Sequence, residues 1–430
     1  MADSSNVDFK PTAKYRRYVL FVLTGVYAFN FIDRQILVIL SEPIKADLGL
    51  SDGQIGLLTG LAFAFFYVIL GIPIARYADR ANRKNIVAVA LTVWSAMTAL
   101  SGLAQNFTQL LLARVGVGVG EAGGSPPAHA IISDYYPPKK RATALSIYSM
   151  GVYIGVFLGF LVGGIIGKIY GWRIALFALG IPGILYAILV YYTVKEPPRG
   201  LTDQVKDMNQ SSFVDVLKVL FSKKTFLFTA LATGTQTFIN YGVGNFTPAF
   251  LMRIHGMDLT QVSIVLAICA GLGGGFGTFM GGYIADKMRE KDIRWYLWIG
   301  VFGAGLNLIP ATIFYFSGNV NLVIGAILIS NIMTALYLGP SIAVSHSLVS
   351  AKMRAVTSAV LFLVLNIIGL GLGPLTIGLL SDYLEPTYGA ESLRYAFMVS
   401  YVTSALTMIL FYLASKHYAK EIIVVEEEGN

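Results

Sequence analysis

Four ionisable side chains stand inside strongly apolar stretches of this 430-residue chain: Asp33 and Arg34 in one stretch, Arg114 and Glu121 in another. A charge at the centre of a bilayer costs at least about 2.5 kcal/mol on insertion scales, so buried acids and bases must pair or face a water-filled cavity. Arg114 and Glu121 are seven residues apart, which places them on one helical face, about 10 Å apart along the axis. We expect Asp33 to lie at the depth of Arg114, so that these two can meet, with Glu121 nearer the midplane.

Such a group can bind protons and anions. Burial favours the neutral form of a carboxylic acid and a neighbouring guanidinium favours the carboxylate, so an arginine that moves would load or release a proton. We therefore predict that Asp33 and Glu121 couple protons to conformation. Arg34 and Arg114 would be their exchangeable partners and would also bind the anionic group of a solute. The alternative is a static network that only holds the bundle together.

The composition predicts an all-α membrane protein. Hydrophobic residues make up 55% and charged residues 13% of the chain, about half the charged share of a soluble domain. Apolar stretches of about 20 residues recur, each long enough to cross a hydrocarbon core as a helix, and they do not alternate as barrel strands do. We place twelve spans at about 17–40, 53–75, 84–105, 107–134, 142–167, 172–194, 224–252, 260–285, 295–317, 320–348, 355–380 and 394–415.

Basic residues gather on one side of these spans, as in Arg16-Arg17, Lys139-Lys140 and Lys223-Lys224. The positive-inside rule then places both termini in the cytoplasm, and we expect a multi-pass protein of the cell (inner) membrane. The net charge of +8 is thus a topology signal with a smaller role in holding membrane lipids, and it does not indicate nucleic acid. The single cysteine, Cys269, lies in an apolar run and has no partner for a disulfide or a zinc site.

Features of the first half recur in the second at offsets of roughly 207 to 214 residues. The recurring pairs are Ala75-x-x-x-Asp79-Arg80 with Gly282-x-x-x-Asp286-Lys287, and Arg141-Ala142 with Arg354-Ala355. Such a repeat predicts two pseudo-symmetric six-helix bundles in the same orientation, with a binding site between them at the midplane. We expect the bundles at 1–194 and 223–430, joined by a cytoplasmic linker at 195–222 that contains an amphipathic surface helix.

Glycines at every fourth position indicate close helix packing. They are Gly151, Gly155, Gly159 and Gly163 in the fifth span, Gly273, Gly277 and Gly281 in the eighth, Gly56 and Gly60 in the second, and Gly369 and Gly373 in the eleventh. We predict that these faces meet across the interface between the bundles, helix five against helix eight and helix two against helix eleven.

The loop Asp79-Arg80-Ala81-Asn82-Arg83-Lys84 resembles the cytoplasmic signature of the major facilitator superfamily, and Arg114 with Gly118 and Gly120 resembles its fourth-helix motif. Within that family, Phe29-Asn30-Phe31-Ile32-Asp33-Arg34 and Gly118-Val119-Gly120-Glu121-Ala122 are most similar to the Spinster branch. The resemblance implies the major facilitator fold, Asp33 and Glu121 as coupling residues, and contact of Asp79 with the start of helix eleven when the inner side closes. The expected cytoplasmic gate consists of Asp79, Arg80, Arg83, Arg141, Asp286 and Arg354.

Two positions depart from the family pattern. Ala75 replaces the usual glycine of the loop signature, and Phe160 replaces the proline of the antiporter motif. The second departure leaves symport and antiport both open.

The second half has no charge in mid-span, so its cavity candidates are neutral. We expect the cavity and the solute to contact Asn30, Gln236, Asn240, Tyr241 and Tyr337. The first half would then handle protons while the second contributes contacts to the solute.

Together these features predict a proton-coupled secondary active transporter that moves an amphipathic organic anion or a lysolipid-like solute by alternating access. The alternative substrate is a small carboxylate carried by an organic-anion/proton symporter. An intramembrane lipid enzyme would need a His-Asp-Ser or His-x-x-x-His grouping, which the spans lack, and a non-transporting membrane receptor remains a further alternative. No phosphate-binding loop occurs, and we expect no enzyme activity, no cofactor, no metal and a monomer.

Overall fold

The computed structural model describes residues 11–78, 80–202, 213–350 and 353–428. All regular structure in these residues is helical. The first half consists of α1 (Ala13–Ile39), α2 (Ser41–Leu48), α3 (Asp52–Thr59), α4 (Leu61–Ala78), α5 (Arg83–Ser101), α6 (Phe107–Glu121), α7 (Ser125–Tyr135), α8 (Pro138–Tyr170) and α9 (Trp172–Thr193).

A short helix, α10 (Phe213–Ser222), precedes the second half. That half consists of α11 (Lys224–His255), α12 (Leu259–Leu266), η1 (Ala267–Gly273), α13 (Gly274–Arg289), α14 (Trp295–Leu306), α15 (Leu308–Phe316), α16 (Val320–Ala335), α17 (Leu338–Ser347), α18 (Arg354–Leu365), η3 (Asn366–Leu372), α19 (Gly373–Tyr388), η4 (Gly389–Glu391), α20 (Ser392–Phe397) and α21 (Val399–Glu428). The segments η1 and η3 are π-helical, and η4 is a 3₁₀ turn.

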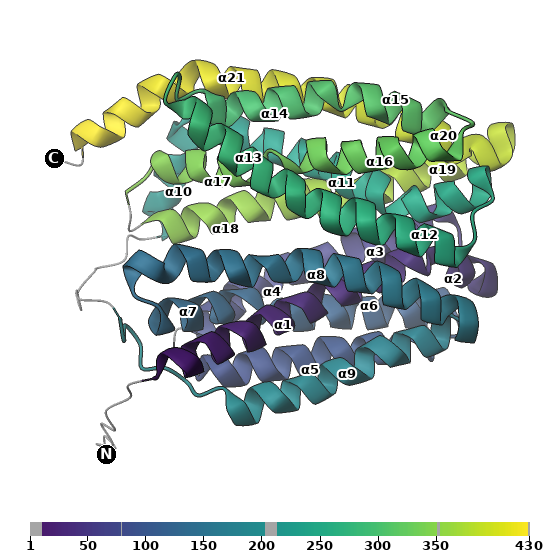
Figure 1. Cartoon of the computed structure of the whole chain (residues 1–430), viewed down its shortest axis with the longest axis horizontal. Coiled ribbons are helices and arrows are strands. Elements are labelled where there is room, and N and C mark those ends of the chain that lie inside the picture. Colours follow the sequence, from purple (N-terminus) through teal and green to yellow (C-terminus); the bar gives the residue numbers. More distant parts are fainter. Residues whose placement is uncertain (1–10, 79, 203–212, 351–352, 429–430) are drawn as a thin grey trace.

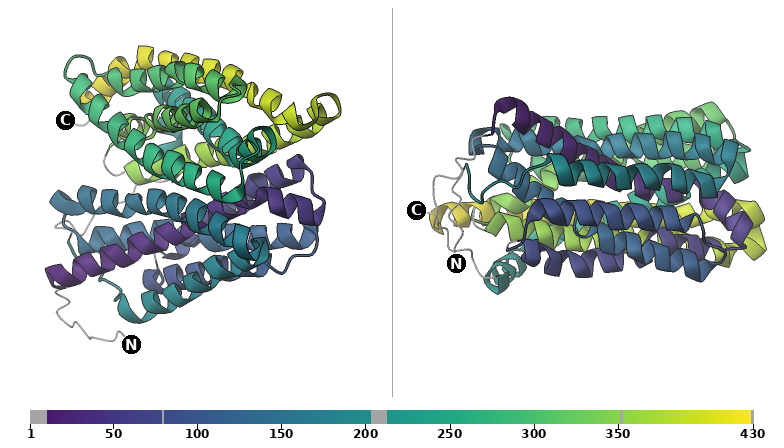
Figure 2. Two further views of the ribbon diagram at one scale, coloured as in Figure 1. Left: turned by 45° about the vertical axis from the view of Figure 1, so that its right-hand side comes forward. Right: turned by 90° about the horizontal axis from the view of Figure 1, so that it is seen from below.

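The helices form two bundles that lie side by side, α1–α9 in one and α11–α21 in the other (Figure 1). The start of α1 and the end of α21 lie at the same end of the molecule, which we call the terminal end, and the opposite end is the far end. At the far end α3 packs against α19, and α8 packs against α12 and, further from that end, against η1. Two further views show the same division into bundles (Figure 2).

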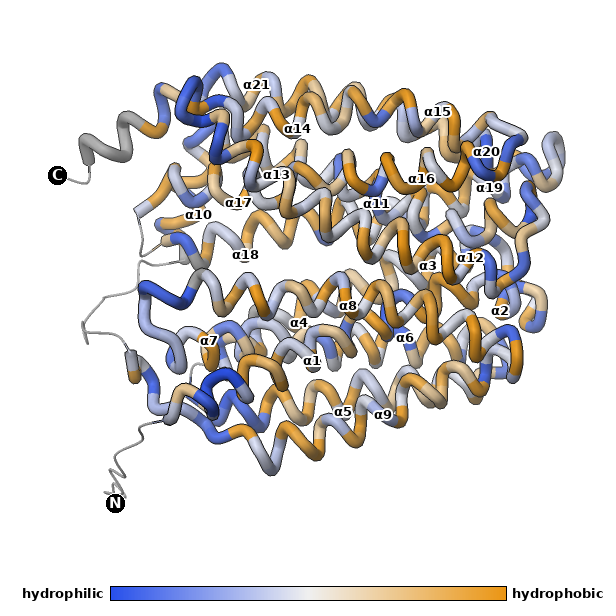
Figure 3. Tube along the Cα trace, in the orientation of Figure 1, coloured by the Kyte–Doolittle hydropathy of each residue, from blue (hydrophilic) through white to orange (hydrophobic). Residues whose placement is uncertain are grey.

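Nine stretches of the described residues are long and apolar enough to cross a membrane. The last of them, Val356–Ile422, folds back on itself and supplies two of the passes, one through α18 and α19 and one through α20 and α21. The paired helices α6 and α7 and the more polar α11 complete the expected twelve passes. Apolar residues dominate the middle of the helices and polar residues the two ends (Figure 3), as helices in a bilayer require.

The two halves of the chain also resemble each other in how corresponding helices begin and where they are interrupted. Ser51 and Gln54 form a reciprocal capping box at the start of α3, and Asp258 and Gln261 form another at the start of α12. Each box satisfies two backbone N–H groups that have no partner within the helix. The second pass then breaks at Gly60, and the eighth pass becomes π-helical from Ala267. The two halves thus share local signals as well as overall shape.

The glycine prediction is correct for both pairs of helices and for Gly56 and Gly60 of helix two, but wrong for the glycines of helices five, eight and eleven, which face their own bundles. A Cβ on Gly155 of α8 would lie 2.4 Å from the carbonyl oxygen of Ala28 on α1, so this ladder packs inside its own bundle. The approach of helix two to helix eleven does need Gly56, because a Cβ there would lie 2.3 Å from the carbonyl oxygen of Pro374. Helices five and eight meet instead through Tyr153, which hydrogen-bonds to Thr278.

The expected amphipathic helix of the linker is α10. Val216 and Leu220 are fully buried on one of its faces, whereas Val214 and Phe221 are exposed. The helix packs against α11 and α18. It therefore joins the end of the linker to the second bundle.

Candidate functional site

The central contact of the first bundle is an ion pair between α1 and α6. The Nε atom of Arg34 donates to Oε2 of Glu121 at 2.8 Å, and Nη2 lies 2.7 Å from the same oxygen. Glu121 is 1% exposed and is the last residue of α6. Because both side chains are largely removed from water, the charge of each is stabilised mainly by the opposite charge of the other.

Aromatic rings hold the guanidinium of Arg34 in place. Its Cζ atom lies 5.0 Å from the ring centre of Phe31, 4.7 Å from that of Phe63 and 5.1 Å from that of Tyr67. Arg114 lies near one of the same rings, with Cζ 5.6 Å from the ring centre of Phe63. Cation–π contacts of this kind stabilise a cation that has lost its water, so Arg34 keeps its charge at this depth.

Asp33 lies apart from this pair, and the expected meeting of Asp33 with Arg114 is not formed. Asp33 is 0% exposed, and neither carboxylate oxygen has a hydrogen-bond partner; Nε of Arg114 has none either. The reason is helical geometry, because neighbouring residues on a helix point about 100° apart. When Arg34 turns toward Glu121, Asp33 must point elsewhere, toward the side chain of Thr98.

Buried polar atoms without protein partners are rare in native structures, and ordered water usually satisfies them. The unpartnered oxygens here include Oε1 of Glu121 and Oδ1 of Asn30, as well as both oxygens of Asp33. The first bundle therefore holds two acids in different surroundings, one bound to an arginine and one without an ion-pair partner.

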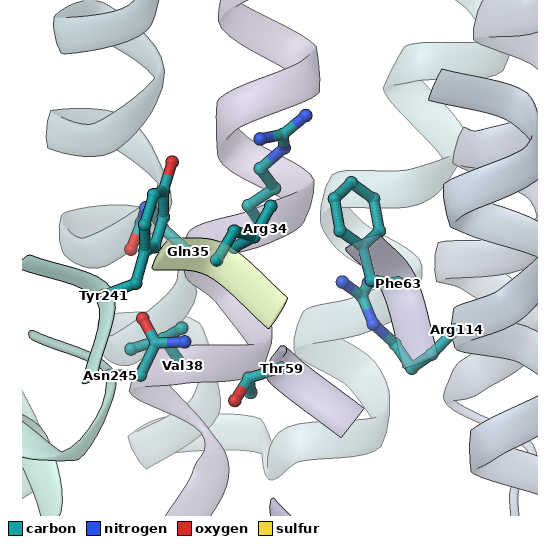
Figure 4. A pocket seen from close by; sticks show the side chains of 9 residues that line it. Arg34, Gln35, Val38, Thr59, Phe63, Arg114, Tyr241 and Asn245 are labelled. Carbon is teal, nitrogen blue, oxygen red and sulfur yellow. The ribbon is translucent and has the colours of Figure 1, made fainter. Parts of the chain in front are cut away.

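A narrow pocket lies beside the ion pair, between the bundles (Figure 4). Both bundles line it, and its lining residues are Arg34, Gln35, Val38, Thr59, Phe63, Arg114, Tyr241, Asn245 and Leu370. Arg34 and Arg114 of the first bundle therefore line the same pocket as residues of the second bundle. The lining residues that were not predicted are Gln35, Val38, Thr59, Phe63 and Leu370. Gln35 offered a signal, because it is a polar amide directly after Asp33 and Arg34, whereas the types of Val38, Phe63 and Leu370 do not separate them from other residues of an apolar helix.

Among the neutral residues expected in the second bundle, Tyr241 lines this pocket. Asn240 donates to the carbonyl oxygen of Thr334 at 3.1 Å, and Tyr337 shares a 2.7 Å hydrogen bond with Thr237. Gln236 is buried and reaches Asn240 at 3.4 Å. These contacts join α11 to α16 and α17, so in this conformation Asn240 and Tyr337 hold the second bundle together.

Arg83, expected at the gate, connects the linker to the first bundle. Its guanidinium donates to Asp134 at 2.5 Å, to Glu196 at 2.6 Å and to the carbonyl oxygen of Pro197 at 2.8 Å. The second carboxylate oxygen of Glu196 accepts from the backbone N–H of Lys84, at the start of α5. The first residues of the linker are thereby held against the terminal end of the first bundle.

We expect Arg83→Ala to free this part of the linker. Charge-assisted hydrogen bonds contribute about 1.5–3 kcal/mol each, so trypsin should cut after Lys195 or Arg199 about tenfold faster in the folded protein. The measurement is the appearance of the two halves on a gel over time. Arg80→Ala, a change of an exposed arginine in the same loop, is the control. Equal cleavage of the two variants would contradict the anchoring role.

The other expected gate residues occupy varied surroundings. Arg141 donates weakly to Thr202 at 3.3 Å, again toward the linker. Asp286 accepts from the hydroxyl of Tyr296 at 2.6 Å within the second bundle. Arg80 and Arg354 are exposed, and Asp79 lies outside the described residues.

The far end holds an ion cluster that was not predicted. Arg253 of α11 donates from Nε to Glu42 at 2.8 Å and from Nη1 to Asp52 at 2.7 Å. Lys45 adds a contact of 2.6 Å to Asp52, which is only 2% exposed. The sequence did carry a signal for this cluster. The loops on this side contain few charged residues, so the few that occur there are candidates for specific ion pairs.

The comparisons with known proteins agree with this architecture. The family model described as Major Facilitator Superfamily matches residues 23–367. An MFS-type efflux pump of Mycolicibacterium smegmatis (strain ATCC 700084 / mc(2)155) is 35% identical over 405 residues, which cover 94% of this chain and 93% of that protein. The hexuronate transporter of Bacillus subtilis (strain 168) is 27% identical over 280 residues, which cover 64% of this chain and 65% of that protein.

Among solved structures, a bacterial homolog of the human lysosomal transporter Spinster, in an inward-facing and unoccupied conformation, superposes with a TM-score of 0.89. It is 33% identical, and the match covers 96% of this chain and 99% of that chain. With the buried charges of α1 and α6 in a two-bundle helical fold, these matches identify the chain as a multi-pass membrane transporter of the major facilitator superfamily, in its Spinster-like branch.

Proposed function

We propose that the chain is a proton-coupled secondary active transporter that moves an amphipathic organic anion, such as a lysolipid, by alternating access. The observation that carries the proposal is the Arg34–Glu121 ion pair beside a pocket lined by both bundles. A cation in this position can bind a solute anion, and its partner is a group that can take up a proton.

Coupling follows from competition for one guanidinium. Arg34 uses Nε and Nη2 on Glu121, so a solute anion that binds the guanidinium draws it away from the carboxylate. A buried carboxylate that loses its cation is strongly unfavourable and becomes neutral by taking up a proton. Solute anion and proton would therefore bind together. Asp33, without an ion-pair partner in the same bundle, is the second site where a proton can be held.

The surroundings of Arg34 favour a solute with both an anionic and an apolar part. The anionic group would meet Arg34, and the apolar part would lie on Phe31, Phe63 and Tyr67, the rings that surround it. A small carboxylate is the second candidate, because Gln35, Thr59 and Asn245 add polar groups to the pocket and a relative carries the name hexuronate transporter.

We further propose that the terminal end faces the cytoplasm, in a cell membrane. The basic residues at that end support this orientation. The far end, where the bundles are joined by ion pairs, is then the outer end. The conformation described here would correspond to an inward-facing state, as the similarity to an inward-facing relative suggests.

A binding measurement tests the exchange of partners. Lysophosphatidylglycerol or D-glucuronate is added to the purified protein in weakly buffered detergent that contains a pH indicator. We expect the true solute class to cause uptake of about one proton for each molecule bound, and Arg34→Ala to abolish both binding and uptake. Binding of either compound without a change in pH would contradict the coupling. Binding of the sugar acid alone would favour the second candidate.

A further inference from the structure

The outer end of the molecule contains a helix cap that one bundle supplies to the other. The backbone N–H of Asp52 donates to Oδ1 of Asp382 at 2.8 Å, and that of Gly53 donates to Oδ2 at 2.8 Å. The hydroxyl of Ser51 also donates to Oδ2, at 2.6 Å. Asp382 belongs to α19 of the second bundle, whereas the three donors stand at the start of α3 in the first.

This carboxylate sits where the charge of a helix favours it. The first N–H groups of a helix have no partner within it, and they carry a partial positive charge that attracts an anion. The approach depends on Gly53, because a Cβ at that position would lie 2.8 Å from Oδ2 of Asp382 and 2.8 Å from a methyl carbon of Leu379. The residue types on both helices therefore fit this contact.

The ion cluster beside the cap also crosses between the bundles. Arg253, from the second bundle, holds Glu42 and Asp52 of the first. Ser381, the neighbour of Asp382, donates to Asp52 at 2.7 Å. Cap and cluster share Asp52, so they form and separate together. We call these contacts, made by Glu42, Asp52, Arg253, Ser381 and Asp382, the outer latch.

The start of α3 does not depend on the latch for its own stability. Its capping box, in which Ser51 and Gln54 satisfy each other's backbone N–H groups, lies within the first bundle. When Asp382 moves away, α3 keeps that cap, and water can reach the N–H groups that the carboxylate leaves. The contact with Asp382 can therefore break and re-form without unfolding the helix.

We propose that Asp382 is a positioning residue of the transport cycle, which holds the outer end closed by capping α3 and must release it before the pocket opens outward. This inference rests on the alternating access of the proposed function. In that cycle, the contact of Asp382 with α3 would stabilise the state that is closed at the outer end. The latch thus biases the protein toward the conformation described here.

The test measures access to the pocket from outside. Cys269→Ser removes the native thiol, and Val38→Cys places a new one in the pocket, at a residue that is 3% exposed. Cells carrying this protein are treated with a membrane-impermeant maleimide. We expect Asp382→Asn to raise the labelling rate about tenfold, since it weakens charge-assisted hydrogen bonds across the outer end. Glu391→Gln is the matched control, because Glu391 pairs with Arg394 within its own bundle at the same end.

A second variant covers the case in which Asp382→Asn does not fold. Gly53→Ala keeps every charge but inserts a methyl group against Asp382, and we expect it to raise labelling as well. Unchanged labelling in a folded variant of either kind would overturn the latch. The assay needs neither solute nor pH gradient, so its failure would leave the proton coupling of Glu121 untouched, and loss of that coupling would not affect labelling.

Discussion

Glu121→Gln is expected to abolish accumulation driven by a pH gradient while leaving the protein folded. Glutamine keeps the shape and an oxygen that can accept from Arg34, but it cannot exchange a proton. One pH unit across the membrane is worth about 1.4 kcal/mol for each proton, or about tenfold accumulation of the solute. The measurement is uptake into proteoliposomes with and without an imposed gradient. We expect the gradient to make no difference to the variant.

The same assay has an internal control. Exchange of labelled for unlabelled solute at equal pH moves no net proton, so Glu121→Gln should retain it. Asp33→Asn should behave in the same way if its unpaired carboxylate is a second proton site. Glu391→Gln, a change of an acid that pairs with Arg394 away from the pocket, should leave the dependence on the gradient unchanged. A variant of Glu121 that still concentrates solute along a proton gradient would exclude this residue from coupling.

Arg34→Ala is expected to lower the free energy of unfolding by about 3–5 kcal/mol, because it leaves the carboxylate of Glu121 buried without its cation. The double variant Arg34→Ala with Glu121→Gln removes both charges and should recover most of that loss. Asp33→Asn should cost much less, since Asp33 has no ion pair to lose. Thermal unfolding in detergent measures these differences across five proteins: the wild type, Arg34→Ala, Glu121→Gln, the double variant and Asp33→Asn.

The decisive quantity is the coupling between the two substitutions. If Arg34→Ala destabilises the protein equally with and without Glu121, then the ion pair contributes nothing and the loss comes from packing against the aromatic rings. If Asp33→Asn destabilises as strongly as Arg34→Ala, then Asp33 has a partner that this conformation lacks.

The sequence determined the helices of this protein and the depth of its charges. The expected spans agree with the observed helices to within a few residues for most of their ends, because hydropathy and capping residues such as Asn82 and Asn106 act locally. It also determined that four charges must be shielded from lipid, since their cost in a bilayer does not depend on the fold. The repeat of about 207 residues predicted the two bundles, and the family resemblance agreed with it.

Only the tertiary structure decided which of these charges meet. Asp33 and Arg34 are adjacent in sequence, yet one forms no ion pair and the other binds Glu121, because the rotation of α1 about its axis decides which side chain faces α6. The rotation of α8 about its own axis likewise turns its glycine ladder toward α1 and away from the second bundle. The outer latch joins residues as far apart as Asp52 and Asp382. Contacts of that kind depend on how whole bundles dock, and no local pattern in a chain encodes the docking of two rigid bodies.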